Sequence, residues 1–376
     1  MQHDEAAGAV LRIDLDALVS NYRTIQREAA PAAVAAVIKA DGYGRGAATV
    51  LDRLRSAGSR TFFVAQLGEA IALEPRRHQG IALFILNGLQ PGAEDCCAAA
   101  GAIPVLNSLH QIDRWAGTAR KLGRILPAAL QIDSGMSRFG LEPADVAILA
   151  ADRTRLGGIQ LQLVMSHLAC ADDPEAAANT EQLRNFETLA RHFPGTPKSL
   201  DNSAGSFLGR DHFDLVRAGI ALYGGAPHAG RNPMRAVVSL EARIAQLRTV
   251  SAGAGVGYGL THRFDRPARL ATIPVGYADG WPRQLSNRGS AFISGIRVPI
   301  VGRVSMDSTT FDVTHVPDAL LYPGAPVELF GEHQTVDDVA ADAGTISYEI
   351  LTQLSRRYRR EYRDGRDMER NRSAAL

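Results

Sequence analysis

Polar residues that could do chemistry follow apolar runs in the N-terminal half of the chain, and Lys39 is the first of them. Lys39 follows the run AVAAVI, so its amine is expected to be partly desolvated. Desolvation lowers the pKa of a lysine and favours the neutral amine, which can form a Schiff base. Taken alone, a lysine that caps a strand or pairs with Asp41 is the more frequent explanation.

A histidine and two arginines lie at or beyond the ends of later apolar runs. His167 closes the run IQLQLVMS, Arg138 lies in the segment DSGMSRFG, and Arg217 ends a weaker apolar segment. A buried histidine satisfied by its neighbours is the simpler explanation of His167, although its ring could stack on a flat cofactor. The ten histidines show no HxH or HExxH spacing, so no metal site is predicted.

Two short segments offer groups that bind phosphate. Ser203, after Asn202, supplies a hydroxyl, although it also suits the start of a helix. Gly219 permits close backbone approach, so the amides of Gly219 and Ile220 could hold phosphate oxygens. Ordinary turns explain either segment alone. Together with Lys39 they match pyridoxal 5'-phosphate (PLP), a cofactor that needs both an amine and a phosphate-binding site.

These residues fall where a parallel sheet would bring them together. Between about residues 34 and 223, eight apolar segments alternate with amphipathic stretches such as 108–121 and 173–192. This pattern is typical of a parallel sheet covered on both faces, and eight units predict a (β/α)8 barrel. A doubly wound sheet is the alternative, because the last two segments are weak. The eight segments are 33–39, 61–66, 81–86, 102–107, 125–133, 159–168, 198–203 and 213–217.

The pattern changes near residue 236. Period-two alternation, Thr and Val enrichment and Gly turns then predict antiparallel β structure, before a helical pattern returns at 345–357. The predicted fold class is α/β, with a PLP-binding (β/α)8 barrel in residues 1–233 and a mostly antiparallel β domain in residues 234–376. Residues 1–12 are a candidate to pair with the second domain. The boundary falls in the Gly/Pro-rich segment GGAPHAGRNP.

The composition excludes several classes of protein. A length of 376 residues suits two domains, and 41 Lys+Arg against 40 Asp+Glu give no sign of a nucleic-acid or membrane partner. Neither a signal peptide nor an apolar stretch of membrane-spanning length is visible, and the three cysteines contain no CxxC motif. We expect a cytoplasmic protein with reduced thiols. The arginine-rich segment from Arg356 is expected to be a solvated surface segment.

Beyond these features, the sequence resembles the alanine racemase family of fold-type III PLP enzymes. The matching segments follow the family's order between residues 36 and 362, and VGYADGWPR (275–283) and GRVSMD (302–307) are the most specific. The other segments are AVIKADGYGRGA (36–47), QIDSGMSRFGLEP (131–143), MSHLACADDPE (165–175), DNSAGS (201–206), VRAGIALYGGAP (216–227), VGYG (256–259) and TISYEILTQLSRRYRREY (345–362).

The resemblance implies a racemase that interconverts L- and D-alanine and supplies D-alanine for peptidoglycan. It implies that Lys39 carries PLP, that His167 packs on the cofactor ring and that Arg217 faces the ring nitrogen. The remaining cofactor-binding residues that it implies are Tyr43, Asn202, Ser203, Gly219, Ile220 and Tyr348.

The resemblance also implies a homodimer whose active sites are shared between subunits. Lys39 and Tyr258 of the other subunit act as the two catalytic bases, and Arg138 contacts the cofactor and the substrate carboxylate. The residues that narrow the access path and bind the amino-acid substrate from the other subunit are Tyr277, Arg303, Met306 and Asp307.

The sequence departs from the usual family pattern at Gln131, where many members have a carbamylated lysine that orients the arginine equivalent to Arg138. Three alternatives remain. A racemase of another small amino acid such as serine would share these motifs. A PLP-dependent decarboxylase usually places a carboxylate, not an arginine such as Arg217, opposite the ring nitrogen. A non-catalytic PLP-binding barrel would lack the second domain.

Overall fold

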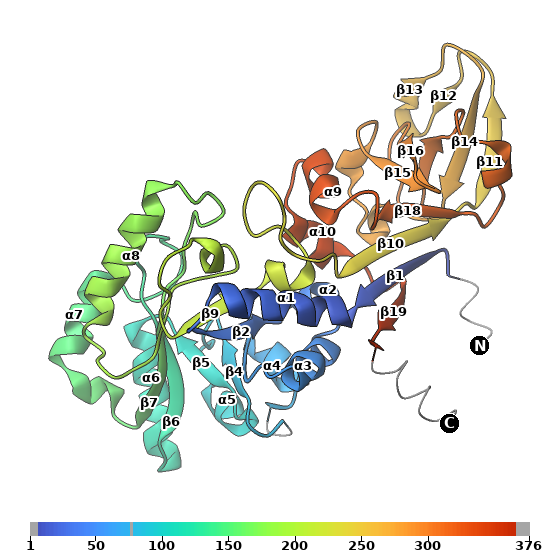
Figure 1. The fold of residues 1–376 in the computed structure, drawn as a ribbon. Helices are drawn as coiled ribbons and strands as arrows, with labels where there is room; N and C mark the ends of the chain where they lie inside the picture. The colour runs from blue at the N-terminus through green and yellow to red at the C-terminus, as the bar shows by residue number, and fades with distance from the viewer. Residues whose placement is uncertain (1–6, 76–77, 366–376) are drawn as a thin grey trace, which may run out of the picture. The chain divides into compact units, whose positions relative to one another are not determined.

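The structure is a computed structural model that describes residues 7–75 and 78–365, and the chain forms two compact units (Figure 1). The first unit contains Val19–Leu222 and Ala226–Met234. The second unit contains the described residues of Met1–Leu18, Tyr223–Gly225 and Arg235–Leu376. The expected domain boundary between residues 233 and 234 stays a prediction.

Eight parallel strands form the sheet of the first unit, in the order β8-β7-β6-β5-β4-β3-β2-β9. The backbone N–H of Arg217 donates to the carbonyl of Asp201 (2.9 Å), so β9 also meets the chain just beyond β8 and the barrel is nearly closed. Each predicted apolar segment overlaps one strand, which confirms the predicted (β/α)8 barrel. The strands are β2 Ala33–Val37, β3 Thr61–Val64, β4 Ala82–Ile85, β5 Ile103–Leu106, β6 Leu126–Gln131, β7 Ile159–Met165, β8 Lys198–Ser199 and β9 Leu215–Ala218.

The barrel strands are apolar on both faces because the barrel interior covers one face and helices cover the other. All four residues of β5 and of β9 are buried, and Phe63 of β3 stacks on Phe84 of β4 with ring centroids 4.8 Å apart. The predicted amphipathic stretch 108–121 overlaps helix α6, and the stretch 173–192 contains helix α8. The α-helices that precede β8 in the sequence are α1 Leu15–Glu28, α2 Lys39–Gly44, α3 Ala47–Ser56, α4 Leu67–Ala72, α5 Glu94–Ala100, α6 Leu109–Leu122, α7 Pro143–Ala151 and α8 Ala177–Ala190.

The second unit is mainly antiparallel, as predicted. Its sheets have the strand orders β16-β15-β18-β10-β1-β19, β11-β14-β17 and β12-β13. In β10, buried Val238, Leu240 and Ala242 alternate with more exposed residues, because successive side chains of a strand point to opposite faces. The strands are β1 Ala9–Asp14, β10 Val238–Arg243, β11 Gln246–Val250, β12 Gly255–Val256, β13 His262–Arg263, β14 Ala268–Ile273, β15 Ser290–Ile293, β16 Ile296–Pro299, β17 Thr309–Asp312, β18 Pro326–Phe330 and β19 Arg359–Arg363.

The two ends of the described chain meet in the six-stranded sheet. Strand β1 pairs antiparallel with β10 and parallel with β19. Within the arginine-rich segment expected as solvated surface, Arg359–Arg363 form the edge strand β19, where Arg12 of β1 lies 3.1 Å from Glu361. The part of that segment in residues 366–376 lies outside the described residues. Two helices, α9 Val336–Ala343 and α10 Ser347–Gln353, lie between β18 and β19 in the sequence.

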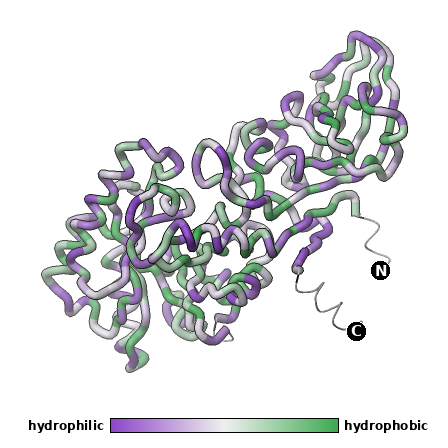
Figure 2. The backbone as a smooth tube through the Cα atoms, viewed as in Figure 1, coloured by the Kyte–Doolittle hydropathy of each residue, from purple (hydrophilic) through white to green (hydrophobic). Residues whose placement is uncertain are grey.

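Polar residues occur along both units (Figure 2). Over residues 7–75 and 78–365, no helix is both long enough and apolar enough to cross a membrane.

Candidate active site

Nine predicted site residues lie in the first unit, in or after five of its strands. The carboxyl ends of parallel strands meet at one end of a barrel, so these residues share the barrel mouth. They are Lys39 and Tyr43 after β2, Arg138 after β6, His167 after β7, Asn202 and Ser203 after β8, and Arg217, Gly219 and Ile220 in and after β9.

Lys39 opens a left-handed turn, which Figure 1 labels α2. Ala40, Asp41, Gly42 and Tyr43 all have φ between 52° and 62°. The left-handed conformation costs an L-residue other than glycine roughly 1–2 kcal/mol. Three such residues in this short turn therefore require compensating contacts from the surrounding chain.

Burial lowers the pKa of Lys39, and the positive charge of Arg138 lowers it further, while the carboxylate of Glu69 opposes both effects. This environment favours the neutral amine, as the sequence predicted. A neutral amine can act as a nucleophile towards a carbonyl carbon and as a base.

Arg217 is buried, with 3% of its surface exposed, and is held by backbone and hydroxyl oxygens. Its Nη1 donates to the carbonyl (3.0 Å) and the hydroxyl (2.5 Å) of Ser199, and its Nη2 donates to the carbonyls of Ser166 (2.5 Å) and Leu200 (3.3 Å). Burial lowers the pKa of Arg217 to about 10, partly offset by the carboxylate of Asp201. The guanidinium is therefore still a cation at neutral pH, with a fixed orientation.

His167 lies next to this guanidinium. Its Nδ1 is 3.2 Å from Nη2 of Arg217, which has only donors, so Nδ1 accepts and the imidazole is neutral. Burial lowers the pKa of His167 well below 6.5, and the charges of Arg217, Arg138 and Lys39 act in the same direction. Nδ2 of Asn202 lies 3.4 Å from the other ring nitrogen. A neutral imidazole at this place can contact a ring without adding charge to it.

Three loops converge on a small polar cradle. The hydroxyl of Ser203 accepts from the backbone N–H groups of Gly219 (2.7 Å) and Ala221 (3.4 Å). A Cβ added to Gly219 would overlap the hydroxyl of Tyr43, so this hydroxyl lies against the Gly219 backbone. Two hydroxyls and two backbone N–H groups thus meet where the loops after β2, β8 and β9 come together. Such a set can bind phosphate oxygens.

The loop that carries Arg138 is fixed by its own side chains. Asp133 accepts the backbone N–H of Ser137 through both carboxylate oxygens (3.2 and 3.0 Å), and Ser137 has a positive φ of 56°. Gln131 is buried, and its Nε2 donates to the carbonyl of Phe139 (3.2 Å). Gln131 therefore supports the backbone beside Arg138, a contact that the sequence did not predict.

Gln182 of α8 was missed by the sequence analysis. Its Nε2 donates to the carbonyl of His167 (2.9 Å), and its Oε1 accepts the N–H of Ala169 (2.8 Å). Asn185, three residues further along the helix, donates to the carbonyl of Ser134 (3.1 Å) in the loop of Arg138. These two amides tie the loops after β6 and β7 to one helix. Gln182 shares the buried face of α8 with Phe186 and Ala190, so its helical spacing from these two apolar residues is the signal that could have indicated it.

Asp201 was also missed. It is 1% exposed, forms an ion pair with Arg210 and lies within hydrogen-bond distance of His212, whose Nδ1 is 2.7 Å from Oδ2. Asp201 directly precedes Asn202, so this cluster anchors the loop that presents Ser203. The sequence shows the charged residues but not that they meet.

Six further predicted residues lie in the second unit, and all of them are exposed. Tyr258 is 71% exposed, Met306 53%, Tyr277 42% and Tyr348 39%. Tyr258 begins a 3₁₀ turn between β12 and β13, and Tyr348 lies in the first turn of α10. The other two, Arg303 and Asp307, lie close to Met306 in the sequence. Large exposed side chains of this kind are frequent where another chain binds.

Backbone bonds and one arginine join two loops of the second unit. The N–H of Tyr277 donates to the carbonyl of Ser305 (3.0 Å). Arg357 pairs with Asp279 (3.1 Å) and with Asp307 (2.7 Å), so it bridges the segments GYAD and SMD.

Arg303 lies beside the turn of Tyr258. A Cβ added to Gly259 would lie 3.2 Å from Nη1 of Arg303. Arg303 and the turn of Tyr258, which were predicted from separate motifs, are therefore neighbours. In the part of the chain that the structure describes, no group of three or more His, Cys, Asp or Glu side chains is arranged to hold a metal ion.

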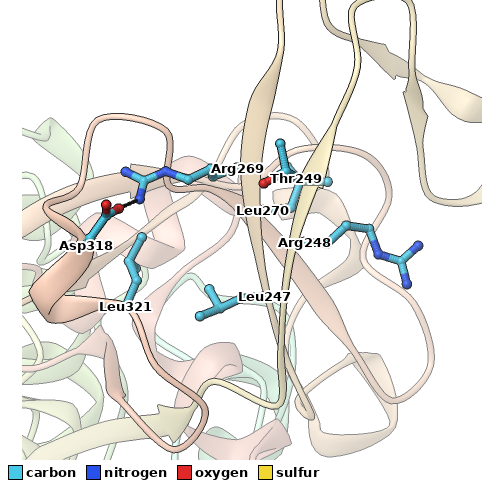
Figure 3. A pocket seen from close by; sticks show the side chains of 7 residues that line it. All are labelled: Leu247, Arg248, Thr249, Arg269, Leu270, Asp318 and Leu321. Carbon is cyan, nitrogen blue, oxygen red and sulfur yellow. Dashed lines mark hydrogen bonds and ion pairs between the residues drawn. The ribbon is translucent and has the colours of Figure 1, made fainter.

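A cavity of about 260 Å³ lies in the second unit, on the sheet β11-β14-β17 (Figure 3). Arg269 forms an ion pair with Asp318 there and donates to the carbonyl of Thr314 (2.9 Å), while Arg248 points away from this pair (Figure 3). None of the predicted site residues lines this cavity. Because Arg269 is already paired with Asp318 and no predicted site residue lies here, this cavity is not the candidate active site.

Two family patterns match the chain. The alanine racemase N-terminal domain matches residues 13–227, and the alanine racemase C-terminal domain matches residues 237–362. A catabolic alanine racemase of Agrobacterium fabrum is 52% identical to this chain, and an alanine racemase of Brucella canis is 49% identical. Each alignment covers 96% of this chain and 95% of the relative.

Solved structures agree with these matches. An alanine racemase from Bartonella henselae with covalently bound pyridoxal phosphate has a TM-score of 0.91 and 42% identity, over 95% of this chain and all of that one. The biosynthetic alanine racemase of Pseudomonas aeruginosa has a TM-score of 0.88 and 34% identity over the same shares. The predicted resemblance is confirmed, and the chain belongs to the alanine racemase family.

Proposed function

We propose that this chain is a PLP-dependent racemase that interconverts L- and D-alanine. The observation that carries the proposal is a lysine of lowered pKa, Lys39, at the same barrel mouth as the polar cradle of Ser203, Gly219 and Tyr43. PLP needs one group for its aldehyde and another for its phosphate, and this barrel mouth offers both. Full-length similarity to named alanine racemases supports the choice of reaction.

The chemistry of the donors fits this cofactor. Lys39 would bind the aldehyde carbon, and the hydroxyls of Ser203 and Tyr43 with the backbone of Gly219 and Ile220 would hold the phosphate. Gly219 suits this role because a Cβ there would displace the Tyr43 hydroxyl. Asn202 and, from the second unit, Tyr348 complete the proposed set of cofactor-binding residues.

When bound, PLP withdraws electrons from the α-carbon of an amino acid and makes its proton easier to remove. Arg217 would affect how strongly the cofactor withdraws electrons. A guanidinium has no acceptor and remains charged, so a ring nitrogen opposite it stays unprotonated. His167 adds no charge, because burial keeps its pKa well below 6.5. We infer that the site gives a moderate electron sink, which limits side reactions such as transamination.

Racemisation removes the α-proton from one face and returns a proton to the other, so two bases are the simplest arrangement. We assign one face to Lys39, whose lowered pKa favours a neutral amine. We assign the other face to Tyr258, and we propose that Arg138 binds the substrate carboxylate. Met306 is proposed to help bind this carboxylate through its backbone.

We propose that the active enzyme is a homodimer in which Tyr258 of each subunit serves the Lys39 of the other. Support comes from the exposure of Tyr258, Tyr277 and Met306, whose apolar surface a second copy would cover. Asp307 and Arg303 would take part from the same subunit as Tyr258. We propose a barrel domain of residues 1–233 and a second domain of residues 234–376 within each subunit, with the N-terminal segment 1–12 pairing with the second domain; the pairing of β1 with β10 supports this last point.

We further propose that the enzyme supplies D-alanine for peptidoglycan. Enantiomers have equal free energies in water, so the same active site serves synthesis or breakdown, and metabolite concentrations set the direction. The relative from Agrobacterium fabrum is named as catabolic, which makes the breakdown of alanine the competing role. A deletion strain that requires added D-alanine for growth would support the peptidoglycan role, and normal growth without D-alanine would contradict it.

One assay tests the reaction. The purified chain is incubated with single L-amino acids and the products are separated on a chiral column. D-Alanine should form fastest. Faster production of D-serine, or release of carbon dioxide, would replace the proposal by a serine racemase or a decarboxylase. Borohydride should fix the cofactor on Lys39, so that mass spectrometry finds it on the peptide containing Lys39.

A second experiment tests the shared site. Lys39→Ala and Tyr258→Phe subunits are each expected to be inactive, but a mixed dimer contains one intact pair of bases. Mixing should restore part of the activity. Proven heterodimers without any recovery would contradict sharing between subunits.

A further inference from the structure

The left-handed turn after Lys39 has an outside support. Oε1 of Glu69 accepts the backbone N–H of Ala40 at 2.5 Å. The other carboxylate oxygen, Oε2, accepts the N–H groups of Ala65 (2.7 Å) and Gln66 (3.0 Å), just beyond the end of β3. Glu69 therefore joins the residue next to Lys39 to the neighbouring strand of the barrel.

We propose that Glu69 is a positioning residue that holds the left-handed turn and thereby sets the places of Lys39 and Tyr43. The proposal rests on the proposed function only in assigning cofactor contacts to these two residues. The strain of the turn gives the reason: Ala40, Asp41 and Tyr43 adopt a conformation that L-residues avoid, and a charged acceptor favours it.

Helix capping alone does not account for this arrangement. Glu69 is the third residue of α4 and caps the helix through Gln66. Asp338 does the same in α9, where its carboxylate accepts the N–H (2.8 Å) and hydroxyl (2.7 Å) of Thr335. Asp338 is satisfied within its own helix start, whereas Glu69 uses one oxygen for Ala40, which lies 29 positions earlier. This oxygen, Oε1, is the one that supports the left-handed turn.

The carboxylate of Glu69 also affects Lys39 electrostatically. Its negative charge raises the pKa of Lys39, against the larger effect of burial and that of Arg138. Loss of the charge and loss of the bond to Ala40 are separable, because one variant removes both and another removes only the bond.

Glu69→Gln removes the charge and one acceptor. A glutamine has a single amide oxygen, and its NH2 group cannot accept, so it cannot satisfy all three N–H groups. Keeping the two bonds to Ala65 and Gln66 turns the NH2 group towards the N–H of Ala40. Glu69→Asp keeps the charge, and Asp338 shows that an aspartate at this helix position still caps, but the side chain is one methylene too short to reach Ala40 as well.

The test is hydrogen–deuterium exchange of the full-length holoenzyme, read on peptides that cover residues 38–47. The N–H groups of Gly42, Arg45 and Gly46 are hydrogen-bonded within this turn. Both Glu69 variants should exchange them on the order of tenfold faster than wild type, because one charge-assisted bond is lost. Asp338→Asn, the matched capping variant, should leave this segment unchanged. Both Glu69 variants should also release PLP faster.

Unchanged exchange over residues 38–47 in Glu69→Asp and Glu69→Gln would overturn the proposal. So would loosening in Glu69→Gln alone, because the charge and not the bond would then be responsible. Exchange does not depend on the reaction. If the wild-type chain failed to bind PLP or to racemise alanine, the proposed function would fail while the exchange result still decided whether Glu69 holds the turn.

Discussion

Replacing Gly219 by alanine tests the proposed phosphate cradle in its narrowest place. The φ of Gly219 is not positive, so an alanine adopts its backbone conformation without strain, and any effect must be steric. The added Cβ would overlap the hydroxyl of Tyr43, while the next atom, Cζ of the same ring, would lie 3.3 Å away and Cβ of Val37 3.8 Å away. The hydroxyl of Tyr43 is therefore the group that must move.

The size of the effect follows from this overlap. The Tyr43 hydroxyl would have to retreat by roughly 1 Å to regain van der Waals separation from the new methyl group. Overpacking of this kind costs about 1–3 kcal/mol. If the displaced hydroxyl is a phosphate ligand, we expect PLP to bind roughly 5- to 150-fold more weakly to Gly219→Ala. Thermal stability should fall less, because Tyr43 can move into the space that the phosphate would fill.

The assay is a titration of apoenzyme with PLP, followed by absorbance of the bound cofactor. Tyr43→Phe removes the overlapping atom, so adding Gly219→Ala to the Tyr43→Phe variant should weaken binding less than adding it to wild type. Gly68→Ala is the matched control, because a Cβ there meets no atom within 4 Å. Wild-type affinity in Gly219→Ala, or an equal penalty in both backgrounds, would refute the reasoning.

Three further predictions concern bases and charges. Tyr258→Phe should lower racemisation by about 10²–10⁴-fold, yet D-alanine should still exchange its α-proton with deuterated solvent through Lys39; equal exchange of both enantiomers would contradict two bases. Activity should be the same in bicarbonate-free buffer, because Gln131 donates to Phe139 and cannot form a carbamate; recovery on adding bicarbonate would contradict this. The folded chain holds the pKa of His167 well below 6.5. Below pH 6.5 the unfolded chain therefore binds more protons than the folded chain, and the free energy of unfolding should decrease by up to about 1.4 kcal/mol for each pH unit of acidification. Urea unfolding at pH 7.5 and 5.5 should show this slope in wild type and a smaller one in His167→Gln; equal slopes would be evidence against it.

Local patterns were enough to predict the barrel. Each barrel strand is buried on both faces, so its apolar run is continuous and visible without any knowledge of its neighbours. The weakest predictions, 198–203 and 213–217, correspond to β8, the shortest strand of the barrel, and to β9. Lys39, His167 and Arg217 were predicted for the same reason, because the residue that ends an apolar run lies at the end of a strand.

The sheet of the second unit was less predictable. Strand β1 and strand β19 come from opposite ends of the described chain and pair with each other. Nothing local marks the arginine-rich strand Arg359–Arg363 as a sheet edge, because its side chains are those of a solvated segment. It pairs with β1 over five residues of backbone register, and Arg12 donates to Glu361, 349 positions away.

The sequence by itself therefore determined the fold class and the family, and it was enough to name the residues that we propose do the chemistry. Only the tertiary structure decided what holds them in place: Glu69 on the turn of Lys39, Gln182 between two site loops, and Asp201 under the loop of Ser203. The physical reason is that burial periodicity and motifs are local along the chain. A hydrogen bond or ion pair between distant residues depends on where the backbone brings a side chain, which no local pattern records.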